Sequence, residues 1–367
     1  MKKFLIAVLI FVLLVSTSIS SFSQPIRLFA GRYTETGGKG LYLFDLNRES
    51  GTFKELSVAE AGPNPSYFCI SKKKELIYAA NEVMEFNGVI GGGVTALKYD
   101  PKNGSIEKIK DLLVPYGGPC FISMTPDESY LLLANYLSSS ITVVKLDANG
   151  IPDSVTDKIA FTEIDGKVSH PHMISFGPSG RVYLTDLGLD RIVIYDFDNQ
   201  KGRLNQSSII NFPKGTGPRH FVFNSSGTKM YVICELNSTI SALDVDKDGG
   251  LKLIQTLSAL AEDFKGESNC GDIHLGNNEQ YLYGSNRGEN TIVVFKIGTD
   301  GKLKLAGRTS CGGDWPRNFV IDPSGKYLLT ANQKSGNIVL YKIDSKSGLP
   351  VTTSKEFKVD SPVCLKF

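Results

Sequence analysis

The chain contains only four histidines, and each stands near the start of a short apolar stretch. His170 and His172 are separated by one residue in "HPHMISF", His220 follows Arg219 in "GPRHFVF", and His274 belongs to "CGDIHLG". Histidine is the side chain that changes its charge nearest to neutral pH, so it commonly acts as a general acid or base. Four histidines in similar sequence positions therefore predict a site that moves protons.

Charged and amide residues recur at a second kind of position, directly after an apolar stretch. Glu235 occurs in "VICEL", Arg287 in "GSNRG" and Asn332 in "LTANQ", while Arg317 precedes an apolar stretch, as Arg219 does. Arginine presents a fork of donors that suits carboxylates and oxyanions, and a carboxylate can act as a base. This mixture is typical of a polar pocket that binds an anionic or oxygen-rich small molecule.

These residues recur because the sequence itself repeats. Six segments contain a short alternating strand, a turn rich in Pro, Ser, Asn, Asp or Gly, and a second strand, which is the pattern of a β-hairpin. A third strand and a more variable fourth follow each hairpin. Four-stranded units at a spacing of 46–54 residues predict a β-propeller, which is an all-β fold. The six segments begin at Pro65, Pro119, Pro171, Pro218, Cys270 and Pro316.

The two ends of the chain supply the parts of one more unit. Residues 361–367, "SPVCLKF", repeat the first strand alone, whereas "RLFAGRYT" from Arg27 matches a second strand and precedes a third and a fourth. Joining these ends completes a blade and hides the edges that an open sheet would expose. We predict one domain, residues 24–367. It is a seven-bladed β-propeller with four antiparallel strands per blade, closed by pairing of the N- and C-terminal strands.

This fold would gather the candidate residues at one mouth of the central channel. The first strand of a propeller blade lines the channel, and the second strand ends beside the start of the first. Strand alternation should turn His170 and His172 to the same side of their strand. The asparagines at the ends of the second strands, together with Asp186, are expected mainly to hold turns, because short polar side chains hydrogen-bond nearby backbone.

Composition limits the location and the partners of the protein. The chain has 40 basic and 38 acidic residues, and a net charge of +2 without a basic stripe argues against nucleic-acid binding. Residues 1–23 show the charged, apolar and small-residue succession of a signal peptide, which predicts a periplasmic or secreted protein without a stable membrane anchor after cleavage. The six cysteines are expected to be small buried hydrophobes, with Cys270 and Cys311 the pair most worth checking for a disulfide.

The motifs "HPH…TDLGLDR", "GPRH…CE", "SNRGENTIVVFKI" and "PRNFVIDPSGKYLLTANQ" resemble the seven-bladed propeller lactonase family. That family includes propeller-type 6-phosphogluconolactonases and carboxymuconate cyclase. The resemblance implies hydrolysis of a sugar-type or carboxylated lactone at the channel mouth without a cofactor. By motif it implies four catalytic residues: His172, Arg219, Glu235 and Arg287. Substrate-binding roles are expected for His170, His220, His274, Arg317 and Asn332.

Several alternatives remain open at this point. Either Glu235 or His172 could be the base, and the same residues could run the lactonising reaction of a muconate-type cycloisomerase. The His-x-His pair with Asp186, Glu235 and His274 could instead hold a metal, because imidazole readily binds divalent metals. A secreted propeller could also be a non-catalytic binding scaffold. An exported protein is not expected to meet a phosphorylated sugar lactone, so export favours lactone chemistry on another substrate.

Overall fold

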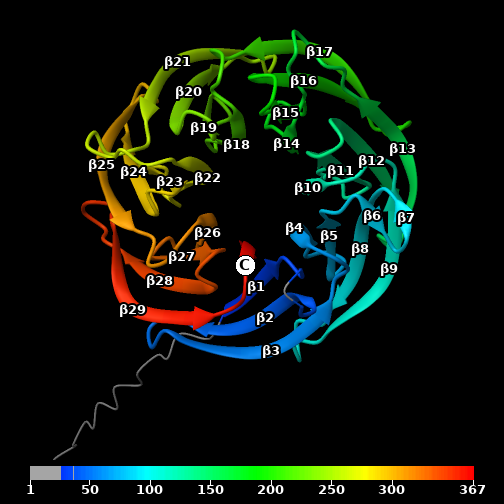
Figure 1. The fold of residues 1–367 in the computed structure, drawn as a ribbon, viewed down its shortest axis with the longest axis horizontal. Helices are drawn as coiled ribbons and strands as arrows, with labels where there is room; N and C mark the ends of the chain where they lie inside the picture. Colours follow the sequence, from blue (N-terminus) through cyan, green and yellow to red (C-terminus); the bar gives the residue numbers. More distant parts are fainter. Residues whose placement is uncertain (1–25, 36) are drawn as a thin grey trace, which may run out of the picture.

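The computed structural model describes residues 26–35 and 37–367, and every regular element in them is a β-strand. Seven four-stranded antiparallel sheets stand around a central axis as the blades of a ring (Figure 1). The prediction of a seven-bladed β-propeller is therefore confirmed. The expected signal peptide, residues 1–23, lies outside the described residues. Nowhere in the described part of the chain is there a helix long and apolar enough to cross a membrane.

Each blade presents its first strand to the axis and its fourth strand to the outside (Figure 1). The first strands are β4 (Pro65–Ser71), β10 (Pro119–Met124), β14 (Pro171–Phe176), β18 (Pro218–Phe223), β22 (Asn269–Leu275), β26 (Pro316–Ile321) and β30 (Pro362–Lys366). The second strands, in the same blade order, are β5 (Leu76–Asn81), β11 (Tyr130–Asn135), β15 (Val182–Asp186), β19 (Lys229–Cys234), β23 (Tyr281–Arg287), β27 (Tyr327–Asn332) and β1 (Ile26–Arg32).

The outer half of each blade follows the same order. The third strands are β8 (Gly92–Tyr99), β12 (Ser140–Leu146), β16 (Arg191–Asp198), β20 (Thr239–Val245), β24 (Thr291–Ile297), β28 (Asn337–Ile343) and β2 (Gly40–Asn47). The fourth strands are β9 (Ile106–Val114), β13 (Pro152–Ala160), β17 (Arg203–Asn211), β21 (Leu251–Ser258), β25 (Leu303–Ser310), β29 (Pro350–Lys358) and β3 (Thr52–Glu60). A short hairpin, β6 (Glu85–Phe86) with β7 (Val89–Ile90), is inserted between β5 and β8.

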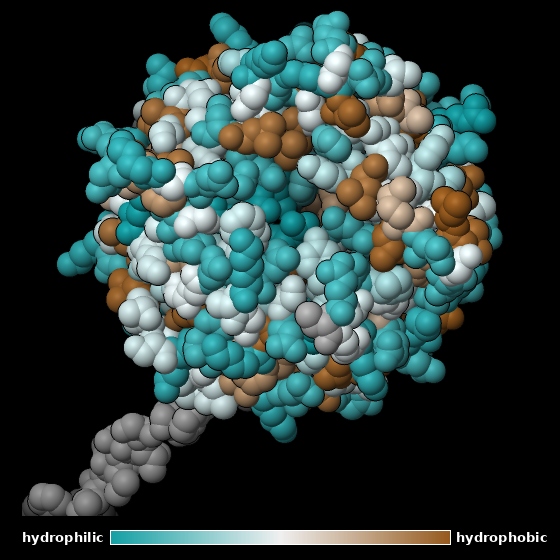
Figure 2. All heavy atoms as spheres, in the orientation of Figure 1, coloured by the Kyte–Doolittle hydropathy of each residue, from teal (hydrophilic) through white to brown (hydrophobic). Residues whose placement is uncertain are grey.

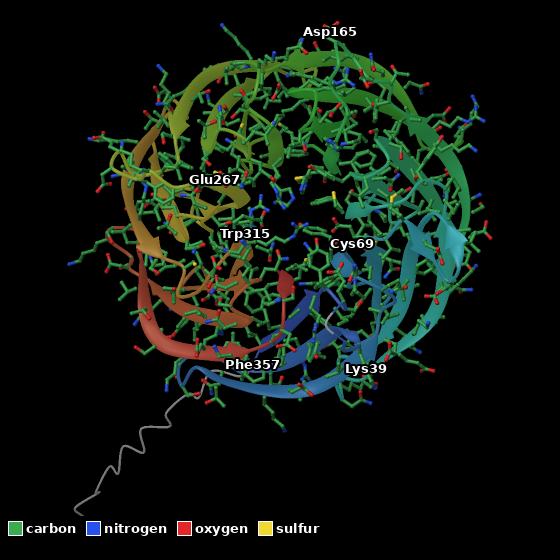
Figure 3. The ribbon with its side chains drawn as sticks, in the orientation of Figure 1. Lys39, Cys69, Asp165, Glu267, Trp315 and Phe357 are labelled. Atoms are coloured by element: carbon green, nitrogen blue, oxygen red, sulfur yellow. The ribbon has the colours of Figure 1, made fainter. Side chains whose placement is uncertain are left out.

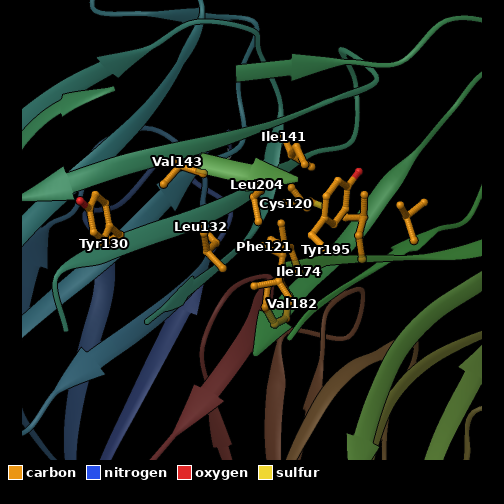
Figure 4. Close-up of a cluster of buried hydrophobic side chains, with 13 residues drawn as sticks. Cys120, Phe121, Tyr130, Leu132, Ile141, Val143, Ile174, Val182, Tyr195 and Leu204 are labelled. Carbon is orange, nitrogen blue, oxygen red and sulfur yellow. The ribbon is translucent and has the colours of Figure 1, made fainter. Parts of the chain in front are cut away.

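Apolar side chains fill the spaces between neighbouring blades. Figure 4 shows one such cluster, where Phe121 and Leu132 of one blade meet Ile174 and Val182 of the next, each 4% exposed or less. The second strands carry apolar residues on both faces, because each sheet is covered on both sides by its neighbours. Burial of these side chains is the main force that holds the blades together.

A repeated tyrosine adds a polar contact between blades. Tyr78, Tyr183, Tyr231 and Tyr283 occupy the same position in four second strands, and each hydroxyl donates to a glycine carbonyl in a turn of the next blade at 2.7–3.0 Å. A buried tyrosine hydroxyl needs such a partner, so these bonds also fix how far each blade is rotated against its neighbour.

The ring closes where the sequence predicted. β30 pairs antiparallel with β1, with Ala30 opposite Leu365 and Gly31 opposite Cys364. Val363, Cys364 and Leu365 are 2% exposed or less, so the last strand is part of the core. The blade of β1, β2, β3 and β30, which we call the closing blade, therefore combines strands from both ends of the chain.

Each first strand contains a bulge near its start. The register against the second strand shifts in all seven blades, so that one residue is left out of the simple pairing in six blades and two residues, Gly271 and Asp272, in the blade of β22. A β-bulge breaks the alternation of side chains and re-aims them, so two successive residues can face the channel. We call the residues after the first paired position the bulge residues: Ser66, Cys120, His172, Arg219, Gly271, Arg317 and Val363.

The bulge overturns the expectation that simple alternation places His170 and His172 on one side of a strand. His170 precedes β14, and the register shift lies between Pro171 and Met173, which makes His172 the bulge residue. The two side chains still meet a common neighbour, Tyr136, but they do so from a turn and a bulge rather than from alternate positions of a regular strand.

All six cysteines are free. Cys270 and Cys311, the pair considered for a disulfide, are both buried and unpaired. The Cys270 thiol contacts the Asn286 side-chain oxygen at 3.1 Å, and the Cys311 thiol contacts the carbonyl of Gly313 at 3.1 Å. Burial raises the pKa of Cys311 to about 12, which keeps its thiol protonated. The cysteines act as small core residues.

Leu365→Ala should lower the free energy of unfolding by about 2–5 kcal/mol, because it opens a cavity in the closing blade. Leu365 is 2% exposed, whereas Val351 on the outer strand β29 is 54% exposed, so Val351→Ala should change stability by no more than about 0.5 kcal/mol. Chemical denaturation of both variants, with a chain lacking residues 361–367 as the extreme case, measures this. A truncated chain as stable as the full one would contradict closure by β30.

Candidate functional site

Each second strand carries an asparagine, or another residue at the equivalent position, at or near its end. The residue that follows this position lies at the channel mouth. In one blade Asn135 pairs with Pro119 and Ser140, and Tyr136 follows it. We call the equivalents of Tyr136 the mouth residues: Tyr33, Glu82, Tyr136, Leu187, Glu235, Arg287 and Gln333. Figure 2 shows a hydrophilic hollow at the ring axis, and Figure 3 labels Trp315 and Cys69 on opposite sides of that opening. The bulge and mouth residues form the wall of the site.

Glu235 holds two arginines from different strands. Its Oε2 atom accepts from Nε of Arg219 at 2.8 Å and lies 2.7 Å from Nη2 of Arg287. Arg219 is the bulge residue of β18, and Arg287 ends β23 in the next blade. All three side chains are at most 18% exposed. Three of the four predicted catalytic residues therefore form one buried cluster.

The cluster is electrostatically unbalanced in favour of positive charge. Burial opposes ionisation of Glu235, but Arg287 and Arg219 outweigh it and hold the pKa of that carboxyl below its usual value. Burial lowers the pKa of Arg287 to about 10, so this guanidinium stays charged at neutral pH. Two guanidinium groups thus share one carboxylate.

Each arginine keeps a nitrogen for a ligand. Arg219 uses Nε for Glu235 and Nη1 for the carbonyl of Gly271 at 2.6 Å, and its Nη2 makes no hydrogen bond within the described chain. Arg287 uses Nε and Nη2 for the carbonyls of Asn269 and Cys270 and for Glu235, which leaves Nη1. Buried donors fixed in this way can stabilise a developing oxyanion.

His172 is buried beside this cluster but makes no direct bond to Glu235 among the described contacts. Its ring meets Tyr136 edge-on at 5.7 Å and His220 edge-on at 5.0 Å between centroids. The Nδ1 atom is buried without a hydrogen-bond partner. Burial, followed by the charge of Arg219, holds the pKa of His172 well below its usual value. The imidazole is therefore neutral at neutral pH, and one of its nitrogens is free to interact.

Arg317 belongs to a second ion pair across the mouth. Its Nη2 atom lies 3.5 Å from Oε2 of Glu82, and its guanidinium stands over the ring of Tyr33 at 5.4 Å. The Tyr33 hydroxyl donates to the same Glu82 oxygen at 2.9 Å. Glu82 and Tyr33 were not among the predicted site residues. Their signal was their place one residue after Arg32 and Asn81, positions equivalent to those that precede Glu235 and Arg287.

His170 holds the wall of the site together. Its ring stacks on Tyr136 with centroids 4.5 Å apart, and its Nδ1 atom lies 3.1 Å from the Tyr136 carbonyl. Its backbone N–H donates to Asp186, which also pairs with Arg191 at 3.0 Å. Asp186 is fully buried and holds this turn, in agreement with its expected structural role.

His220 and His274 lie on either side of a buried carboxylate. Asp272 Oδ1 is 2.7 Å from Nδ1 of His220, and Asp272 Oδ2 is 2.9 Å from Nε2 of His274. The His220 ring also contacts the rings of Tyr67 and Phe121, which reach it from other blades. His220 is 4% exposed, so it lies within the channel, whereas the His274 side chain is 35% exposed.

Asn332 is held within its own blade one residue before the mouth position, and its role in substrate binding stays a prediction. The residue is fully buried, and its side-chain amide donates to the carbonyl of Cys311 at 3.0 Å. Gln333, the next residue, follows β27 and is the mouth residue of this blade. Gln333 Oε1 is buried without a hydrogen-bond partner.

The residues that the sequence suggested as metal ligands are not brought together in a metal-binding arrangement. Among the described residues, no group of three or more His, Cys, Asp and Glu side chains is arranged to hold a metal ion. Glu235 is engaged by two arginines, and His170 by the Tyr136 carbonyl.

A closed propeller ring with a buried arginine–carboxylate cluster at one channel mouth has the character of an enzyme rather than of a flat docking surface. Residues 27–367 match the family described as "Lactonase, 7-bladed beta-propeller". The chain belongs to this family, whose membership supports lactone hydrolysis.

Named relatives agree with this assignment. The 6-phosphogluconolactonase of Bacillus subtilis is 31% identical over 92% of this chain and 97% of its own length. The solved periplasmic gluconolactonase of Pseudomonas aeruginosa covers 93% of this chain and 98% of its own, with 27% identity and a TM-score of 0.87. A putative 6-phosphogluconolactonase from Bacteroides fragilis covers 95% and 99%, with 32% identity and a TM-score of 0.86.

Asn332→Ala should lower the free energy of unfolding by about 1–3 kcal/mol, because it removes the buried hydrogen bonds of the Asn332 amide to the Cys311 carbonyl and to Asn337. Turnover by the folded variant should be unchanged. The neighbouring Gln333→Ala should show the reverse, with stability within about 0.5 kcal/mol of the parent and a raised KM. Thermal unfolding and steady-state kinetics on one lactone measure both. Equal effects on turnover would mean that Asn332 does face the ligand.

Proposed function

We propose that this protein hydrolyses a sugar-type lactone at the channel mouth. The observation that carries the proposal is the pair of arginines held on Glu235, each with one terminal nitrogen that makes no hydrogen bond within the described chain. Hydrolysis of a lactone develops negative charge on the carbonyl oxygen, and buried, preorganised donors stabilise that charge far better than water does. Membership of the lactonase family supports the same reaction.

In this mechanism His172 is the base, which is one of the two assignments that the sequence allowed. The neutral imidazole takes a proton from a water molecule, whose oxygen attacks the lactone carbonyl. The resulting oxyanion faces Arg219 and Arg287. When the intermediate collapses, the ring C–O bond breaks and the leaving oxygen takes the proton from His172, which gives a hydroxy acid.

Glu235 is the weaker candidate for the base. Two arginines bind one of its oxygens and lower its pKa, which makes the carboxylate less basic. Its role in this mechanism is to orient the two guanidinium groups. His172 carries a buried Nδ1 atom without a partner, and a ligand or water that bonds to it would remove that energetic cost.

The charges at the site favour a neutral or singly charged substrate. Arg317 is paired with Glu82, so the Arg219–Glu235–Arg287 cluster carries one excess positive charge. One positive charge matches an oxyanion or one carboxylate, but a phosphate dianion would remain partly uncompensated. We therefore propose an unphosphorylated aldonolactone as the substrate. An extracytoplasmic location, expected from residues 1–23, agrees with this choice.

Purified protein should hydrolyse glucono-1,5-lactone with a higher kcat/KM than its 6-phosphorylated form. A pH-stat assay on a panel that includes a muconolactone measures this preference and detects the lactonising alternative. Excess chelator should leave the rate unchanged. Activity that is lost with chelator and restored by a divalent metal would contradict the proposed mechanism, and the absence of any lactone hydrolysis would contradict the function.

His172→Ala and Arg287→Ala should each lower kcat/KM for the best lactone roughly 10²-fold or more, as losing a base or an oxyanion donor does. Asn135→Ala is the matched control, because Asn135 is fully buried and bonds within its own blade. It should lose thermal stability and keep turnover. A His172→Ala variant with full turnover and lowered stability would show that this histidine only fills the wall of the channel.

The pH profile tests the base directly. His172 must be neutral to act, and burial with Arg219 lowers its pKa, so protonation requires a pH below the ordinary histidine value of 6.5. As the pH falls, kcat/KM should stay level through 6.5 and decline only further into the acid range. A decline centred at or above pH 6.5 would argue against His172 as the base.

A further inference from the structure

Asp272 is a buried carboxylate with three side-chain partners around the channel. It lies between His220 at 2.7 Å and His274 at 2.9 Å, and the side-chain amide of Asn318 donates to its Oδ2 atom. Although burial opposes ionisation, the neighbouring histidines hold the pKa of Asp272 well below its usual value. The proposed mechanism assigns no role to this residue, although Asp272 contacts His220 and His220 contacts Arg219 of the catalytic cluster.

The carboxylate decides which nitrogen of His220 carries the proton. Burial, with the charge of Arg219, lowers the pKa of His220 to about 4, so the ring is neutral at neutral pH and has one N–H group. Because Nδ1 is 2.7 Å from an ionised oxygen, that proton is on Nδ1. Nη1 of Arg219 lies 3.3 Å from Nε2 and 3.5 Å from Nδ1, which places the guanidinium over the face of this neutral ring.

The segment that contains Asp272 also contacts Arg219 directly. Nη1 of Arg219 donates to the carbonyl of Gly271, the residue before Asp272, at 2.6 Å. A side chain at Gly271 has no room, since a Cβ atom there would lie 2.6 Å from the Ser285 hydroxyl and 2.8 Å from the Pro316 carbonyl. The bulge of β22 thus places one carbonyl and one carboxylate where both fix the same arginine.

We propose that Asp272 is a positioning residue for the lactonase reaction, which acts through His220 to orient Arg219. This inference rests on the proposed function, because Arg219 is assigned there to the oxyanion. With the proton on Nδ1, Asp272 fixes the plane of the His220 ring, and that ring supports the guanidinium of Arg219 so that Nη2 stays free for a ligand. With the proton on Nε2, Nδ1 would turn a lone pair to the Asp272 carboxylate, and the carboxylate would no longer hold the ring.

Asp272→Asn tests the proposal against a matched carboxylate. It should lower kcat about 10- to 100-fold with KM within about twofold, because a misplaced oxyanion donor affects the transition state more than substrate binding. Asp322→Asn is the control. Asp322 is also fully buried and holds a turn with Arg48 and Ser324, away from the mouth. It should lose stability and retain kcat. If Asp272→Asn behaves in the same way as Asp322→Asn, Asp272 is structural and the proposal fails.

A measurement on the unmodified protein keeps the proposal testable if Asp272→Asn does not fold. Nitrogen-15 NMR of the histidine rings should show His220 as the neutral Nδ1–H form, with a strongly deshielded proton that disappears in His220→Gln. Finding the Nε2–H form would overturn the proposal. This result does not depend on turnover, so a protein that hydrolyses no lactone yet has the Nδ1–H form would refute the proposed function while leaving the hydrogen-bonded arrangement intact.

Discussion

The pairing of β30 with β1 is the contact on which the rest of the structure depends. Without it, the blades of β4 and β26 would each face solvent on one side, and the apolar faces that drive blade packing would be exposed. The site depends on the same contact. Tyr33 follows a strand of the closing blade, while its partners Glu82 and Arg317 belong to the blades on either side. Closure therefore completes the core and one wall of the mouth together.

The chemistry of the mouth follows from the burial of unequal numbers of positive and negative charges. Placing a charge in a low-dielectric interior is costly unless a partner compensates it. Glu235 compensates only one of its two arginines, so the cluster carries one excess positive charge. The histidines nearby stay neutral because burial, and after it the charge of Arg219, opposes an additional positive charge.

The sequence predicts the fold well because the repeat is strong and both chain ends match it. The residues of the candidate site were predicted only in part. Arg219, Glu235 and Arg287 meet because they occupy equivalent positions in adjacent blades, which the repeat reveals. Asn332 is bonded within its own blade, and a one-residue step along a strand, which reverses the direction of a side chain, separates it from the mouth residue Gln333. The bulge at His172 has no sequence pattern that distinguishes it from regular alternation. Tyr33 and Glu82 were missed because their partner Arg317 comes from a distant part of the sequence.

The two strands that close the ring come from opposite ends of the chain, with Phe29 opposite Lys366. Their contact therefore closes the longest loop in the molecule, and the entropy lost in forming it grows with loop length. The other six blades are each built from contiguous segments and require only short loops. The time needed for this protein to become active is consequently tied to its least local contact. Joining the two ends by a short linker, with new termini opened at an exposed turn, would convert that contact into a local hairpin.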